Sequence, residues 1–236
     1  MTGMTDEGIV LIGGGGHALS VADSIKSAGK YKIIGYTARH NENNKLKYLG
    51  TDDVLKTISN RGVKLAAICV GYLGDHELRD RLYNMAKSFS LQLPPILDPT
   101  AVISETAAIG EGSFVGKNAV LNASSVVGKM CIINTGTIIE HKCSIGDFSH
   151  IAVGAVLCGD VAIGNHVLIG ANATVLQGVE VGMNCIIGAG SIVLANVPEN
   201  TRVLGLWGGY FRSKEIVRCS ADIIERLALS LKKGAA

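Results

Sequence analysis

Residues 97–133 read LDPTAVISETAAIGEGSFVGKNAVLNASSVVGKMCII, and an aliphatic residue returns at every sixth position of this stretch. The phase continues without a slip through Leu97, Ile103, Ile109, Val115, Leu121, Val127, Ile133, Ile139, Ile145, Ile151, Leu157, Ile163, Ile169, Val175, Val181, Ile187 and Val193. Small residues such as Ala119, Ser125 and Ala155 stand four positions after the aliphatic ones, and glycine often follows them directly. A short period held this long indicates a repeat architecture rather than an ordinary β-sandwich.

Each six-residue unit predicts one very short strand followed by a tight corner, and three units close a triangular coil. The aliphatic side chain points into the column and stacks on its equivalents in the coils above and below. One coil cannot bury its own apolar face, so the stacking of coils stabilises the fold. We therefore predict a parallel β-helix over residues 97–197, whose hand the period alone leaves open.

Residues 1–96 follow a different pattern, in which strands alternate with helices. Apolar runs at 8–12, 32–36 and 65–70 predict three strands, and the stretches 19–28 and 75–87 predict helices. This alternation indicates a small Rossmann-like α/β domain with a parallel sheet.

The loop after the first strand reads GGGGHA from Gly13 to Ala18 and leads into a helix. Such a loop turns backbone amides toward a phosphate group. A nicotinamide site is disfavoured, because the second strand ends at Tyr36-Thr37-Ala38 without the acid that holds the ribose. A purely structural loop is a second alternative. We favour a domain that binds a nucleotide-linked or acidic sugar.

Residues 198–236 form a third segment, in which Pro198 ends the repeat and an apolar stripe after Ser220 predicts a C-terminal helix. The net charge of +2, without a basic run, offers no footprint for nucleic acid. No apolar run reaches the roughly 18 residues of a membrane helix, and the polar start is not a signal peptide. We expect no nucleic-acid partner, no membrane insertion and a cytoplasmic location.

The most specific motifs lie in residues 134–164, which contain NTGTIIEH ending at His141 and FSHI around His150. Together with GGGHA at residues 14–18 and with Val70-Gly71, they resemble the hexapeptide-repeat sugar acetyltransferases. The match is to the sialic-acid O-acetyltransferase-like and nucleotide-aminosugar N-acetyltransferase group, whose members act on UDP-4-amino sugars or GDP-perosamine. The resemblance covers about residues 8–205. It implies a left-handed column, acetyl-CoA as co-substrate, and a homotrimer with active sites between neighbouring columns.

The resemblance also implies roles for individual residues. His141 matches the general base, with Glu140 beside it. The positions expected to contact the sugar nucleotide are Gly15, Gly16, His17, Gly71 and Asn134, together with Thr37 and Ala38, where the family often has two aspartates. The positions expected to line the acetyl-CoA groove are His150, Ala171 and Ala189.

A histidine suits this chemistry, because its pKa near ~6.5 lets it take a proton from the attacking amine at neutral pH. The family often places a carboxylate directly after this histidine, where this chain has Lys142. A neighbouring cation disfavours the imidazolium, so His141 either is a weaker base or only orients an amine that arrives neutral. His141 and His150 lie half a coil apart and can converge only between subunits. The spacing of His141, His150 and His166 does not fit a three-histidine zinc centre, so we expect no metal.

The leading hypothesis is N-acetylation of a nucleotide-linked amino-deoxysugar, with a 4-amino group as the favoured acceptor, in the biosynthesis of surface glycans. The alternative enzyme is an O-acetyltransferase of sialic acid or a related sugar. A structural solenoid without activity is disfavoured by the scattered histidines and the separate α/β domain.

Overall fold

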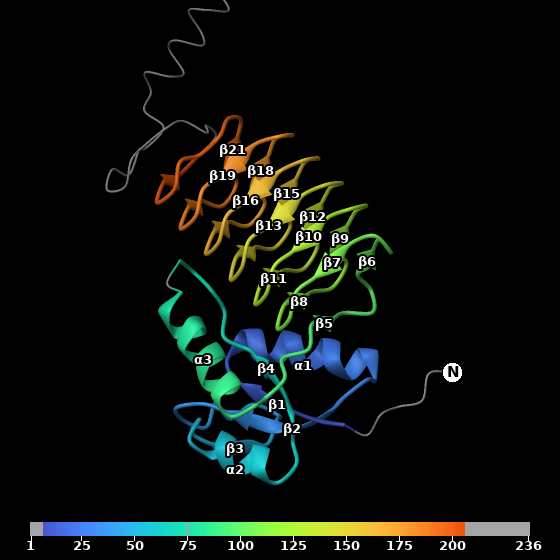
Figure 1. Cartoon of the computed structure of the whole chain (residues 1–236), viewed down its shortest axis with the longest axis vertical. Helices are drawn as coiled ribbons and strands as arrows, with labels where there is room; N and C mark the ends of the chain where they lie inside the picture. Colours follow the sequence, from blue (N-terminus) through green and yellow to red (C-terminus); the bar gives the residue numbers. More distant parts are fainter. Residues whose placement is uncertain (1–6, 75, 206–236) are drawn as a thin grey trace, which may run out of the picture.

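The computed structural model describes residues 7–74 and 76–205. It consists of a small α/β domain and a column of stacked coils that stands on it (Figure 1). The predicted C-terminal helix falls outside the described residues. Among the described residues, no helix has the length and apolar character needed to cross a membrane.

The α/β domain is built on four parallel strands in the order β3-β2-β1-β4, so the predicted parallel sheet is confirmed but the predicted strand number of three is wrong. The strands are β1 (Gly8–Ile12), β2 (Lys32–Thr37), β3 (Tyr48–Gly50) and β4 (Leu65–Ile68). The helices are α1 (Gly16–Ala28), α2 (Val54–Asn60) and α3 (Glu77–Ser88). The elements missing from the sequence prediction are β3 and α2, both short and only partly apolar.

The side chains of β1 alternate between two apolar layers, as a strand covered on both faces requires. Ile9 and Leu11 pack in the layer of α1, whereas Val10 and Ile12 pack in the layer that contains Leu55 of α2 and residues of α3. Both layers also include side chains of the column. The domain and the column therefore share a continuous apolar interface.

The column has three sheets of parallel strands, and each strand pairs with the strands one coil before and after it. The seven-stranded sheet contains β5 (Ile96–Leu97), β8 (Phe114–Val115), β11 (Ile132–Ile133), β14 (His150–Ile151), β17 (Leu168–Ile169), β20 (Ile186–Ile187) and β22 (Arg202–Val203). The six-stranded sheet contains β6 (Val102–Ile103), β9 (Val120–Leu121), β12 (Ile138–Ile139), β15 (Val156–Leu157), β18 (Thr174–Val175) and β21 (Ile192–Val193). The five-stranded sheet contains β7 (Ala108–Ile109), β10 (Val126–Val127), β13 (Ser144–Ile145), β16 (Ala162–Ile163) and β19 (Glu180–Val181).

The interior of the column confirms the six-residue pattern. From Val115 to Val193 every aliphatic residue of the series is buried, as are small corner residues such as Ala119 and the thiol of Cys143. The series is less well buried at the open first coil, where Leu97 is 37% exposed.

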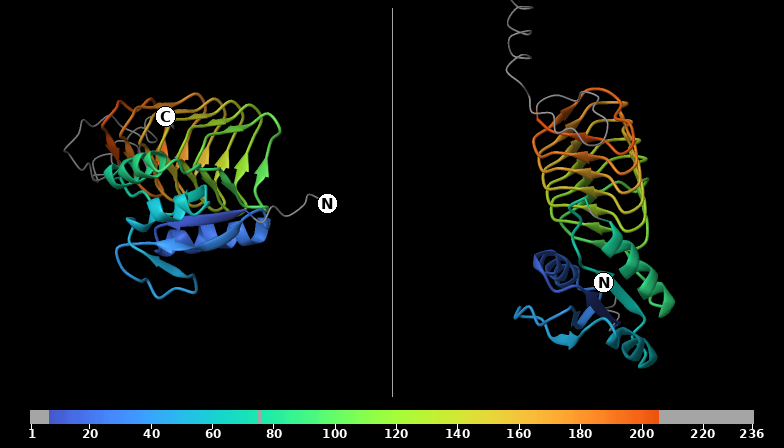
Figure 2. Two further views of the ribbon diagram at one scale, coloured as in Figure 1. Left: turned by 60° about the horizontal axis from the view of Figure 1, so that its bottom comes forward. Right: turned by 90° about the vertical axis from the view of Figure 1, so that its left-hand side faces the viewer.

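Asp98 joins the first coil to the α/β domain, where α1 lies beneath the column (Figure 2). Its side chain accepts hydrogen bonds from Ser24 Oγ of α1 (2.6 Å) and from Thr100 Oγ1 (2.6 Å), and Lys117 Nζ lies 3.4 Å away. Burial alone would raise the pKa of this carboxyl, but the hydrogen bonds and Lys117 lower the pKa to about 2. The ionised form is therefore the one that the fold stabilises.

A pKa of Asp98 lowered from 3.8 to about 2 predicts acid sensitivity. The stabilisation is present above the unfolded-state value and is lost as the pH falls from about 4 toward about 2. We expect the urea midpoint of the native chain to drop across this window. Asp98→Asn should start lower at neutral pH and show a smaller drop. An equal drop in both proteins would assign the acid sensitivity to other carboxyls.

Candidate active site

A cleft of about 330 Å³ opens at the carboxyl ends of β1, β2 and β4, where parallel sheets commonly bind ligands. Its lining comprises Ile12, Gly13, Gly14, Gly15, Thr37, Ala38, Arg39, His40, Glu42, Asp52, Cys69, Val70, Leu78, Arg81 and Leu82. Of the residues predicted to contact the sugar nucleotide, the cleft brings together Gly15, Thr37 and Ala38.

The glycine loop shapes one wall of this cleft. The amide of Gly13 donates to Thr37 O (2.8 Å), which ties the loop to the end of β2. A Cβ on Gly14 would lie 2.3 Å from Cε2 of Tyr36, so only glycine lets the loop rest against this ring. Gly15 then caps α1, and free amides at a helix N-terminus are suited to binding an anion.

An acid does reach the end of β2, although none was found there in the sequence. Thr37 Oγ1 donates to Asp52 Oδ1 (2.7 Å), and Asp52 stands between β3 and α2. Arg39 and Arg81 add two cations to the lining. The sequence analysis missed Asp52 because it missed β3, and the acidic pair Asp52-Asp53 after Gly50 was the available signal.

Gly16, His17 and Gly71 do not line the cleft, and their predicted contacts with the sugar nucleotide stay predictions. The His17 ring packs edge-on against Phe114 of the column at 5.3 Å between centroids. Burial, followed by the charges of Arg79 and His150, lowers the pKa of His17 to about 4. His17 is therefore neutral at pH 7, and its buried Nε2 has no hydrogen-bond partner among the described residues.

His141 is exposed at the corner between β12 and β13. Its ring lies over the backbone of the next coil, because a Cβ on Gly159 would stand 2.5 Å from His141 Cε1 and 2.7 Å from Nε2. The main chains of the two coils are also joined, since the amide of Asp160 donates to His141 O (2.9 Å). Gly159 thus leaves the space that the imidazole occupies.

The side chain of Glu140 accepts two hydrogen bonds at this corner. Its Oε2 accepts from Asn122 Nδ2 (3.0 Å) and from the backbone amide of His141 (3.2 Å). The carboxylate thereby links Asn122 of the preceding coil to the backbone from which the imidazole projects. The predicted catalytic role of Glu140 stays a prediction.

Gly159→Ala is expected to displace the His141 ring without unfolding the coil, because Gly159 does not have the left-handed backbone that L-residues avoid. Misplacement of a reacting group by about 1 Å can cost about 10²-fold in rate. We expect kcat to fall by about 10- to 100-fold, measured as release of free thiol from acetyl-CoA, with a thermal midpoint close to that of the native chain. An unchanged kcat would mean that the position of the His141 ring over Gly159 does not matter for the reaction.

His150 and Asn134 meet at the interface between the column and the α/β domain. His150 Nδ1 donates to Tyr72 O (2.8 Å), so Nε2 is the acceptor for Asn134 Nδ2 at 3.2 Å. Burial is the main cause that lowers the pKa of His150. Within one chain both ring nitrogens are thus engaged, and the roles of His150 toward acetyl-CoA and of Asn134 toward the substrate stay predictions.

Ala171 and Ala189 stack in successive coils, with the amide of Gly190 donating to Ala171 O (2.8 Å). They follow β17 and β20 and therefore stand at the edge of the six-stranded sheet opposite to His141. A single column does not bring the two edges together. A groove that uses both sets of residues needs two columns.

Comparisons with known proteins agree with this architecture. Residues 8–86 match the family model of the PglD N-terminal domain, and residues 107–141 and 160–195 match the hexapeptide repeat of succinyl-transferase. WeeI from Acinetobacter baumannii, at 21% identity, shares the fold with a TM-score of 0.73 over 84% of this chain and 96% of its own.

Two solved structures are nearer in sequence. PerB from Caulobacter crescentus, in complex with CoA and GDP-perosamine, is 30% identical, with a TM-score of 0.79 over 85% of this chain and 95% of its own. The acetyltransferase domain of PglB from Neisseria gonorrhoeae is 30% identical, with a TM-score of 0.77 over 83% of this chain and 96% of its own. With that identity over nearly the full length of both relatives, the chain belongs to the hexapeptide-repeat family of nucleotide-aminosugar N-acetyltransferases.

Proposed function

We propose that the protein transfers the acetyl group of acetyl-CoA to the 4-amino group of a nucleotide-linked amino-deoxysugar, as a cytoplasmic step in surface glycan synthesis. The observation that carries the proposal is the exposed His141 imidazole, which lies over Gly159 on the column. The α/β domain of the same chain opens a cleft of a size that suits a nucleotide. The relatives add support, since PerB binds CoA and GDP-perosamine and the PglB domain binds acetyl-CoA.

The cleft fits a nucleoside diphosphate. The amides at the start of α1 and the guanidinium groups of Arg39 and Arg81 complement a pyrophosphate, and the Asp52 carboxylate suits hydroxyl or ring N–H donors of the nucleoside. In the transfer step the sugar amine attacks the thioester carbonyl and the C–S bond breaks. The amine proton passes to an imidazole nitrogen of His141, and the thiolate leaves as free CoA once protonated.

A second copy of the chain would complete the site. The outward face of the six-stranded sheet carries an apolar row, in which Val102 is 64%, Ile138 38% and Ile192 36% exposed. A homotrimer that covers this row would bring His141 of one column toward Ala171 and Ala189 of the next. Sedimentation should show a trimer, and Val102→Glu with Ile192→Glu should shift it toward smaller species.

The function is tested by incubating the full chain with acetyl-CoA and a panel of UDP-, GDP- and dTDP-linked 4-amino sugars while free thiol is measured. Thiol release and an amide product with one of these sugars are expected. The alternative function, O-acetylation, is addressed by adding sialic acid to the panel. Thiol release with sialic acid and with none of the amines would overturn the proposal.

Asp52→Asn is expected to weaken binding of the sugar nucleotide. Hydrogen bonds to a charged group contribute about 1.5–3 kcal/mol, so the KM for the sugar should rise by about 10- to 100-fold. The value of kcat should change little, because this contact is present in both the ground state and the transition state. Asp53→Asn is the matched control, since Asp53 is exposed and does not line the cleft. Equal KM values for both variants would remove Asp52 from the site.

A further inference from the structure

One corner of the column, between the five-stranded and seven-stranded sheets, is covered by α3 of the α/β domain. Phe148 and His166 stand one coil apart on this corner, each in left-handed backbone conformation. The ring of Tyr83 on α3 packs edge-on against Phe148, with centroids 5.5 Å apart. The ring of His76, just before α3, faces the ring of His166 at 4.2 Å. The helix thus brings its own histidine to a histidine of the column.

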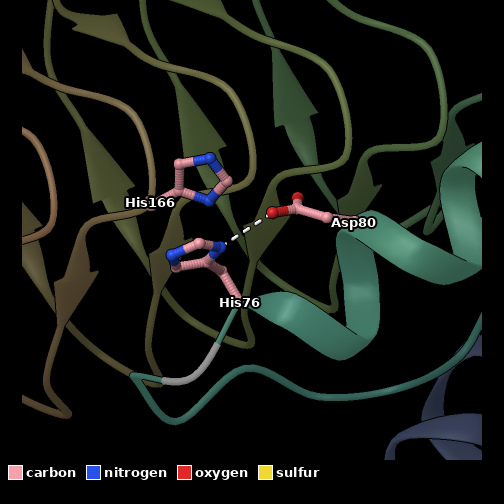
Figure 3. Close-up of side chains that lie close together, drawn as sticks. All are labelled: His76, Asp80 and His166. Carbon is pink, nitrogen blue, oxygen red and sulfur yellow. Dashed lines mark hydrogen bonds and ion pairs between the residues drawn. The ribbon is translucent and has the colours of Figure 1, made fainter.

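His76 and Asp80 belong to one turn of this helix and His166 completes a cluster with them (Figure 3). His76 Nδ1 lies 2.7 Å from Asp80 Oδ2, and one nitrogen or oxygen of each of the three side chains lies within 4.8 Å of the others. Residues four apart on a helix share a face, which is the spacing that helical metal sites use.

One ring contact and two backbone hydrogen bonds fix the position of His166. Its ring stacks on Phe148 with an interplanar angle of 21° and a centroid distance of 5.3 Å. Its backbone oxygen accepts from the Tyr72 hydroxyl (2.6 Å), and its backbone amide donates to Asp147 O (2.9 Å). Nδ1 of this fixed ring is buried and has no hydrogen-bond partner among the described residues. An unsatisfied buried nitrogen costs free energy, and a bound ion would remove that cost.

Two imidazoles and one carboxylate form a donor set suited to Zn²⁺ and similar borderline ions, with water completing the coordination. Bonds of about 2.0–2.2 Å place two ligands of one ion at most about 4.4 Å apart, so small side-chain rotations close the cluster. Burial is the main cause that lowers the pKa of His166, so its imidazole is available as a neutral ligand.

We propose that His76, Asp80 and His166 bind one divalent transition-metal ion of the Zn²⁺ type, and that this ion fastens α3 to the column. No spacing motif marks this site, because His166 is far along the chain from His76 and Asp80 and meets them only where α3 docks on the column. The cluster does not line the cleft and lies at a different corner from His141. The ion therefore acts on the arrangement of the two domains and takes no part in acetyl transfer.

The test uses the tag-free full chain titrated with Co²⁺, whose visible spectrum reports coordination, followed by displacement with Zn²⁺. One equivalent per chain should bind, with nitrogen and oxygen ligands and without the intense near-ultraviolet band of a thiolate ligand. At about a hundredfold excess over Kd, Zn²⁺ should raise the thermal midpoint by about 5–10 °C.

His166→Asn is the decisive variant, because the fold already accepts asparagine in this left-handed conformation, at Asn184 on the same corner of the next coil and at Asn172 on the next corner along the chain. It should weaken Co²⁺ binding at least about tenfold and abolish the thermal shift, while acetyl transfer continues. His76→Gln should weaken binding similarly.

His141→Asn is the matched control. In contrast to His166→Asn, it should lose acetyl transfer and bind Co²⁺ as the native chain does. Three results would overturn the proposal: no binding by the native chain, equal binding by His166→Asn, or a thiolate band in the Co²⁺ spectrum.

Discussion

Replacing His141 with asparagine is expected to lower kcat by about 10²- to 10⁴-fold, the usual contribution of a positioned proton acceptor. Asparagine keeps the polarity and approximate size of the side chain but cannot take up the proton of the attacking amine. His141 is exposed, and the hydrogen bond that its backbone accepts from Asp160 does not depend on the side chain. Turnover should therefore fall in a protein of native stability, measured by thiol release and by thermal unfolding on the same sample.

The pH dependence separates the two roles considered for His141. If its imidazole accepts the proton, the rate of acetyl transfer by the native chain falls as the pH is lowered, and this fall is absent in His141→Asn. If the imidazole only orients a neutral amine, both proteins show the same fall in rate at low pH, because it arises from protonation of the substrate amine. Full turnover of His141→Asn across neutral pH would remove His141 from the mechanism.

Ile139→Ala is expected to give one of the largest losses of stability in the molecule. Ile139 is 0% exposed and stacks between Leu121 and Leu157 of the neighbouring coils, with which its strand pairs. Removal of a buried isoleucine side chain usually costs about 2–5 kcal/mol, and a column with a fixed backbone cannot collapse readily into the cavity. Urea unfolding measures the change in the free energy of unfolding.

The control for Ile139→Ala is Val126→Ala, an outward residue of β10 that is 50% exposed. Its cost should stay below about 1 kcal/mol, because little apolar surface is lost from the interior. Similar losses for the two variants would contradict the inward alternation on which the column depends.

The column was predictable because its signal is repeated and local. Each aliphatic residue of the series packs inside the column in the same way, and its inward orientation depends only on its place in the six-residue unit. The prediction failed in the α/β domain at β3 and α2, where Tyr48–Gly50 and Val54–Asn60 are too short for a pattern to emerge. Their existence depends on pairing with β2 and on packing beneath the sheet, which are long-range effects.

The site was only partly predictable for the same reason. Thr37 and Ala38 line the cleft, and the acid beside them is Asp52, which the unpredicted strand β3 brings to the end of β2. The ring of His17 packs against Phe114 because α1 begins at Gly16, and its predicted contact with the sugar nucleotide stays a prediction. The meeting of His76 with His166 depends on how α3 docks, and no local pattern encodes docking.

The coil repeat sets the distance between the cleft of the α/β domain and His141 in steps of one coil. Hydrogen bonds join residues 18 apart, and neighbouring strands lie about 4.8 Å apart. Deleting one whole coil below β12 would lower His141 by one such step and leave it at the same corner. Deleting six residues would preserve the apolar interior yet rotate His141 by a third of a turn, to a different corner of the column. The separation of His141 from the cleft can therefore change only in whole coils if His141 is to keep its corner.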